Sequence, residues 1–122
     1  MAIGAIAIQG DYAYVGGDYG FNVLHVSEPA RPVQLSYLAV PVRDLEVVDF
    51  YAYILDGQTG LRILDLFDPF APNEIGSYKL PDDTWHLTVA NGVEGKRRHA
   101  FVMSRESGLY ILDVTDPSAV SY

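Results

Sequence analysis

The chain has 122 residues, enough for one domain with a real core, and its 49% hydrophobic and 20% charged composition predicts packed structure and excludes disorder. Its formal net charge of −8 repels phosphate backbones, so we expect no nucleic-acid partner. The chain contains no cysteine, which excludes disulfides, cysteine metal sites and a cysteine nucleophile.

The first segment of the chain, residues 2–8, is its longest apolar stretch. It is far shorter than the roughly 20 residues that a membrane helix needs, and no basic segment precedes it. We therefore expect neither membrane insertion nor a secretion signal within these residues.

Two motifs then recur in the same order along the chain. The sequence Tyr-Ala-Tyr-Val at residues 12–15 returns in similar form at residues 51–54 and 99–102. A run that begins with glycine follows each copy, at residues 20–26, 60–66 and 108–114, and an acidic residue and a proline come after it each time. The sequence therefore predicts three tandem units of about 40 residues each.

The second unit shows the expected local structure most clearly. Residues 45–48, 51–55, 61–66 and 74–79 are short runs rich in β-forming residues, and turn residues separate them, so we predict four strands. Residues 61–66 are apolar on both faces, which places their sheet between two others, as in a blade of a β-propeller.

The predicted fold class is all-β, with three consecutive antiparallel sheets of up to four strands that form a partial β-propeller. We place the blades at residues 1–41, 42–81 and 82–122, and the third blade lacks a full outer strand. The repeat makes two sets of residues equivalent: Tyr12, Tyr51 and His99, and Gly20, Gly60 and Gly108.

Three predicted blades leave two open flanks, since propellers close with about four to eight blades. The outer faces of the first and third blades are expected to expose apolar residues that an inner blade buries. This favours either a homo-oligomer or further blades in a longer chain.

Residues 91–98 of the third unit form a longer connection than the other units have. Asn91-Gly92 is a tight-turn signal, and Lys96, Arg97 and Arg98 follow it. We predict an exposed, mobile protrusion with both arginines in water.

The motifs of the second unit, Tyr-Ala-Tyr-Ile, Gly-Leu-Arg-Ile-Leu-Asp-Leu, Asp-Pro-Phe-Ala-Pro and Gly-Ser-Tyr, resemble the LVIVD repeat of bacterial and archaeal propeller proteins. The resemblance covers nearly the whole chain. The first unit departs from it at His25, where the others have Asp65 and Asp113. Tryptophan-aspartate and kelch repeats fit less well, because the single tryptophan, Trp85, lies outside the third strand and a Gly-Gly pair occurs only once. The resemblance implies a cell-surface or secreted protein.

No residue pattern predicts chemistry. The three histidines, His25, His86 and His99, lack metal-ligand spacing, so we expect no metal and no cofactor. No serine nucleophile motif is present, so we predict no catalytic residue. Asp65 and Asp113 end apolar strands and are expected to accept hydrogen bonds from N–H groups of the turns that follow.

A recognition face is predicted where the connections between blades lie beside the turns that join the second and third strands. Its candidates are Asp18, Tyr19, Arg43, Asp44, Gln58, Asp82, Asp83, Trp85, His86 and Arg105. Trp85 combines a large contact area with a polar N–H group and suits recognition, but Trp85 and Leu87 could equally be core residues of a strand.

The leading hypothesis for function is a non-catalytic module that binds a protein or a small ligand. Two alternatives stay open: a propeller enzyme whose site is completed by other blades, and a purely structural repeat.

Overall fold

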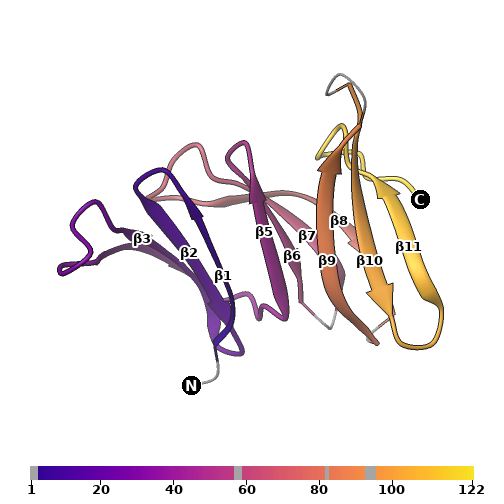
Figure 1. Ribbon diagram of the computed structural model, residues 1–122, viewed down its shortest axis with the longest axis horizontal. Helices are drawn as coiled ribbons and strands as arrows, with labels where there is room; N and C mark the ends of the chain where they lie inside the picture. Colours follow the sequence, from indigo (N-terminus) through magenta and orange to yellow (C-terminus); the bar gives the residue numbers. More distant parts are fainter. Residues whose placement is uncertain (1–2, 57–58, 82, 93–95) are drawn as a thin grey trace.

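The computed structural model describes residues 3–56, 59–81, 83–92 and 96–122. These residues form eleven strands in three antiparallel sheets, each of which follows the chain order (Figure 1). No helix long and apolar enough to cross a membrane is found in this part of the chain. The prediction of an all-β partial propeller is confirmed.

The first sheet contains β1 (Ile3–Gln9), β2 (Tyr12–Gly17), β3 (Gly20–His25) and β4 (Val33–Leu38). The second sheet contains β5 (Asp44–Val48), β6 (Tyr51–Leu55), β7 (Gly60–Asp65) and β8 (Asn73–Lys79). The third sheet contains β9 (Thr84–Asn91), β10 (Arg98–Ser104) and β11 (Gly108–Asp113). The sheets stand side by side, and their first strands, β1, β5 and β9, contact one another in turn (Figure 1).

The three sheets share one register, as the repeat predicts. The first residue of each second strand pairs with the last residue of each third strand: Tyr12 with His25, Tyr51 with Asp65, and His99 with Asp113. Each third strand begins with a glycine at positive φ: Gly20, Gly60 and Gly108. The predicted equivalence of both sets is therefore confirmed.

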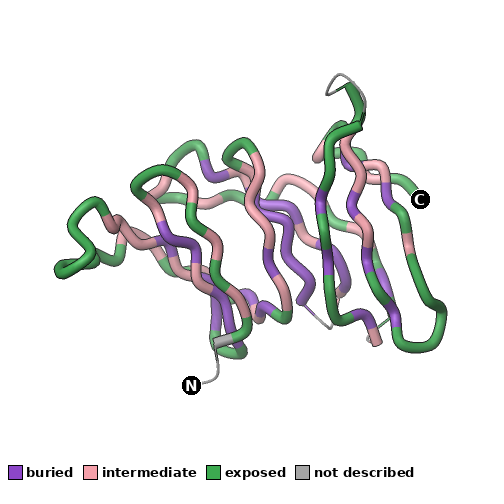
Figure 2. Tube along the Cα trace, in the orientation of Figure 1, coloured by how far each residue is buried: buried purple, intermediate pink, exposed green. Residues whose placement is uncertain are grey.

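The hydrophobic core lies between the sheets in two layers (Figure 2). The second sheet faces both layers, and its strand β7 is buried on both sides: Leu61 and Ile63 in one layer, and Leu64 in the other, are each 0% exposed. The residues that end β7 and β11 behave as expected. Asp65 Oδ1 accepts the Phe67 N–H and Asp113 Oδ1 accepts the Thr115 N–H, both at 2.9 Å.

The prediction that both arginines of the 91–98 connection lie in water is wrong for Arg98. Its side chain is only 17% exposed and lies between the second and third sheets. It donates to Asp49 Oδ2 at 2.5 Å and to the hydroxyl of fully buried Tyr53 at 3.0 Å. The buried Tyr53 hydroxyl needs a partner, and Arg98 at the start of β10 is within its reach. Arg97 is 69% exposed and bonds to Asp113 Oδ2 at 2.7 Å; residues 93–95 lie outside the described part.

Replacing Arg98 by methionine is therefore expected to lower the free energy of unfolding by about 2 kcal/mol, because the Tyr53 hydroxyl would lose its charged donor. Arg97→Met removes the same charge from an exposed position, and we expect it to cost less than about 0.5 kcal/mol. Urea denaturation of the two variants checks this difference. Equal costs would mean that the Arg98 contacts do not stabilise the junction of the sheets.

Candidate binding site

The turns between the second and third strands of each sheet lie at one end of the molecule, together with the connections between sheets. Three backbone hydrogen bonds join them, one in each sheet: Val42 N–H to Gly17 O at 2.9 Å, Leu80 N–H to Thr59 O at 3.0 Å, and Arg105 N–H to Asp83 O at 3.2 Å. Each connection is therefore tied to a turn, and side chains from two sheets meet at this end.

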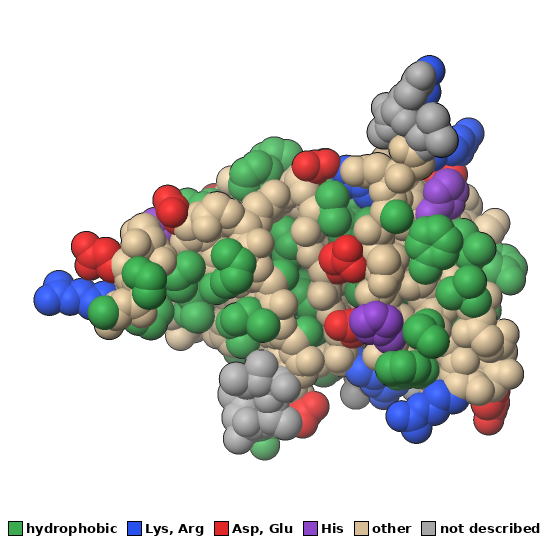
Figure 3. Space-filling model, viewed as in Figure 1, with side chains coloured by type: hydrophobic (Ala, Val, Ile, Leu, Met, Phe, Trp, Pro, Cys, Tyr) green, Lys and Arg blue, Asp and Glu red, His purple; other side chains and the backbone are tan. Residues whose placement is uncertain are grey.

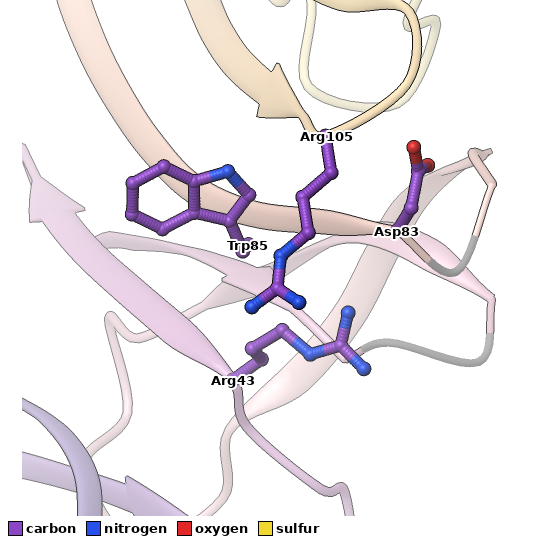
Figure 4. Close-up of a pocket in the computed structure, with 4 residues that line it drawn as sticks. All are labelled: Arg43, Asp83, Trp85 and Arg105. Atoms are coloured by element: carbon purple, nitrogen blue, oxygen red, sulfur yellow. The ribbon is translucent and has the colours of Figure 1, made fainter.

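A pocket of about 310 Å³ lies where the second and third sheets meet at this end, and its lining is Arg43, Asp83, Trp85 and Arg105. Arg43 directly precedes β5, Asp83 and Trp85 lie at the start of β9, and Arg105 belongs to the turn between β10 and β11. Figure 4 shows the guanidinium groups of Arg43 and Arg105 beside one another; the Arg105 group lies nearer to the Trp85 indole, the Arg43 group is turned away from it, and the Asp83 carboxylate points away from both. The pocket thus joins two positive charges to one aromatic surface.

Asp83 builds the turn that carries Arg105. Its Oδ2 accepts the Ser104 hydroxyl at 2.6 Å and the Glu106 N–H at 2.8 Å. The hydrogen bonds from Ser104 and Glu106 lower the pKa of Asp83 below its ordinary value. Asp83 therefore stays ionised near neutral pH and serves to fix the backbone of the turn.

Arg43 is fixed at both ends. Its N–H donates to Leu55 O at 2.7 Å, and its Nη1 donates to Thr84 O at 2.5 Å. The guanidinium therefore bridges the second sheet to the start of β9, at the residue that precedes Trp85.

Trp85 and Leu87 differ in environment, so the hypothesis that both are core residues holds for Leu87 alone. Leu87 is 2% exposed and belongs to the core, whereas Trp85 is 43% exposed. The side chain of Trp85 therefore reaches the surface, 5.8 Å from the ring of His86 between centroids.

Asp44 and His86 contact each other across the junction of the second and third sheets, and neither lines the pocket. Asp44 Oδ2 lies 2.8 Å from His86 Nδ1 and accepts the Leu87 N–H at 2.8 Å. Two residues on, Glu46 Oε2 accepts the Val89 N–H at 3.1 Å, and burial raises the pKa of Glu46. These carboxylates of β5 satisfy backbone donors along the edge of β9, so the first-strand edges of the two sheets are joined.

The remaining candidates do not join the pocket. Asp18 and Tyr19 lie on the exposed turn between β2 and β3, where Tyr19 is 67% exposed. Asp18 contributes with Arg43 and Asp56 to a separate hollow of about 220 Å³. Gln58 and Asp82 lie outside the described residues.

Sequence reasoning missed a second pocket of about 310 Å³ at the opposite end, between the second and third sheets. Asp49, Tyr51, Phe67, Lys96 and Arg98 are among the residues that line it. The basic residues 96–98 are the sequence feature that could have indicated this pocket, but they predicted a solvated tip. Among the described residues, no group of three or more histidine and acidic side chains could hold a metal ion.

The antiparallel sheets, stacked face to face with their first strands in contact, define this protein as a set of β-propeller blades. A solved structure titled the N-terminal domain of Nup159, also a β-propeller, is similar to this chain with a TM-score of 0.56 and 17% sequence identity. The match covers 88% of this chain and 26% of that one, so the chain spans about a quarter of the length of that structure. The LVIVD repeat model matches residues 3–39, 41–80 and 93–122, and the chain belongs to this repeat family. No curated protein sequence matches it.

Proposed function

We propose that this chain is a non-catalytic binding module that holds an anionic group of its ligand between Arg43 and Arg105. The observation that carries the proposal is the pocket in which the two guanidinium groups lie beside one another, with the Trp85 indole in the same lining (Figure 4). Guanidinium groups bind carboxylates through charge-assisted hydrogen bonds, and these are about twice as strong as neutral ones.

The charge distribution supports an anionic ligand. The chain has a net charge of −8, and two arginine side chains nonetheless lie together in the lining of this pocket. The acidic remainder of the surface disfavours long polyanions such as nucleic acid, whose charges extend far beyond the pocket, so a short acidic peptide or a small carboxylate suits the pocket better.

Trp85 supports recognition of the rest of the ligand. Its indole is 43% exposed, which leaves aromatic surface available at the rim of the pocket. Tryptophan gives large contact area at small entropic cost and is enriched among residues that dominate binding energy. The ligand is thus expected to pair a carboxylate with an adjoining apolar or planar part.

The pocket is suited to binding rather than to catalysis. Arginine stays protonated at physiological pH, and Asp83 is held ionised by the turn that it builds. Neither group is poised for proton transfer near neutral pH, which general acid–base catalysis requires.

Titration with a hexaglutamate peptide at low ionic strength tests the proposal, with tryptophan fluorescence as the signal, because Trp85 is the single tryptophan of the chain. We expect a saturable change, and a hexaglutamine peptide of the same length is expected to produce none. Arg105→Gln is expected to weaken hexaglutamate binding at least about tenfold, the equivalent of one charge-assisted hydrogen bond.

Arg31→Gln is the matched control, since Arg31 is exposed in the turn between β3 and β4 and its replacement changes the net charge equally. We expect this variant to bind as the parent chain does. A fluorescence response that Arg31→Gln and Arg105→Gln reduce equally would show general electrostatic attraction and contradict a site at this pocket.

A further inference from the structure

The outward faces of the first and third sheets carry apolar side chains that no other sheet among the described residues covers. Because the three sheets share one register, each of these residues has a defined counterpart in another sheet, on a side that a neighbouring sheet covers. The exposed fraction of each residue can therefore be compared with that of its covered counterpart.

On the third sheet, Met103, Leu109 and Ile111 are 41%, 52% and 46% exposed. They follow His99 and Gly108 at the same intervals as Leu55, Leu61 and Ile63 follow Tyr51 and Gly60. Those three counterparts are 0% exposed, because the third sheet covers them. We call Met103, Leu109 and Ile111 the third-sheet face.

On the first sheet, Ile6 and Ile8 of β1 are 62% and 61% exposed. Ile6 pairs with Val15 as Leu87 pairs with Val102, and Ile8 pairs with Ala13 as Val89 pairs with Ala100. The counterparts Leu87 and Val89 are 2% and 8% exposed, in the core against the second sheet. We call Ile6 and Ile8 the first-sheet face.

The two faces correspond in position to the two sides of the interface between the second and third sheets. Inside the chain, residues equivalent to the third-sheet face pack with residues equivalent to the first-sheet face in the core layer between the second and third sheets. All five residues of the two faces are uncharged, so no charge has to lose its hydration when they meet.

We propose that two copies of this chain assemble into a closed ring of six sheets, in which the third-sheet face of each copy packs against the first-sheet face of the other. One copy cannot join its own two faces, because they lie at opposite ends of the molecule (Figures 1 and 3). A contact between two different faces forms a closed ring only if the rotation from one copy to the next adds up to a full turn. Two copies contribute six sheets, which is within the range of about four to eight blades at which propellers close.

The ring is independent of the proposed binding pocket. The pocket lies between the second and third sheets of a single copy, so either proposal can fail without the other. Five exposed apolar residues on the two faces would become buried, and such burial is the main favourable term in association.

Sedimentation velocity of the 122-residue chain tests the assembly. We expect a species of twice the chain mass at micromolar concentration. Ile8→Lys and Leu109→Glu each place a charge in one face and are expected to weaken the dimer at least about tenfold. Both positions are more than half exposed in the single copy, so circular dichroism and thermal unfolding are expected to report an intact fold.

Mixing the two variants distinguishes a ring from other dimers. A mixed dimer contains one unaltered interface and one in which the introduced lysine faces the introduced glutamate, so the 1:1 mixture is expected to recover dimer that neither variant forms alone. Phe70→Lys is the control, because Phe70 is 67% exposed in the turn between β7 and β8, away from both faces, and its dimer is expected to persist. A monomeric parent chain, open-ended polymers, or a mixture that stays monomeric would each overturn the proposal.

Discussion

Replacing Gly60 by alanine is expected to lower the free energy of unfolding by more than about 3 kcal/mol, and the same change at the equivalent Gly108 by only about 1 kcal/mol. Both glycines begin a third strand at positive φ, +121° for Gly60 and +84° for Gly108. The two sites differ in what a side chain would meet. A Cβ at Gly60 would lie 2.4 Å from Leu80 N and 2.6 Å from Tyr78 O, whereas a Cβ at Gly108 would meet nothing within 4 Å.

This difference arises from the neighbouring strand. Gly60 pairs with Lys79 of β8, so backbone atoms stand directly against it, while no strand among the described residues covers the outer edge of β11. Backbone cannot withdraw as a flexible side chain can, so the clash adds to the conformational cost. Chemical denaturation of the two variants measures both costs. Similar losses in both would show that backbone conformation alone, and not the close approach of β8, sets the cost.

Replacing Asp56 by alanine is expected to cost about 3 kcal/mol, because three donors would lose a buried carboxylate. Asp56 is 5% exposed at the end of β6. Its Oδ1 accepts the Thr59 and Gly60 N–H groups at 2.6 and 2.9 Å, and its Oδ2 accepts Arg62 Nε at 2.5 Å. This carboxylate thus closes the turn into β7 and neutralises the arginine beside it.

Asp18→Ala provides the comparison, since Asp18 occupies the exposed turn between β2 and β3, and we expect its loss to cost less than about 0.5 kcal/mol. Thermal or urea denaturation of both variants checks the contrast. A mild effect at Asp56 would mean that water satisfies the freed N–H groups and that the turn does not depend on the carboxylate.

The strands of the second unit can be predicted from sequence almost to the residue. The strand predicted at residues 51–55 is β6, and the strand predicted at residues 74–79 lies within β8. These predictions rest on alternation of side chains and on glycine and proline at the turns, and both are local properties of the chain. The same local properties, repeated three times, set the register that all three sheets share.

The contacts between sheets cannot be predicted in the same way. The charged tip that carries Arg98 predicts a solvated side chain, yet Arg98 reaches Tyr53, 45 residues earlier in the chain. The pocket combines Arg43 with Arg105, which no motif connects. Such contacts depend on the distance between the sheets and on which strand edges lie against each other. The spacing of residues along the chain determines neither of these.

The sequence alone therefore determined the repeat, its strands and the doubly buried strand β7, because each follows from residue pattern within about 40 residues. Only the tertiary structure decided that Leu87 packs in the core while Trp85 reaches the surface, and that Asp44 and Glu46 bond to the edge of β9. The physical reason is that a strand's alternation says which residues share a face, but the sheet packed against it decides which of those faces is covered.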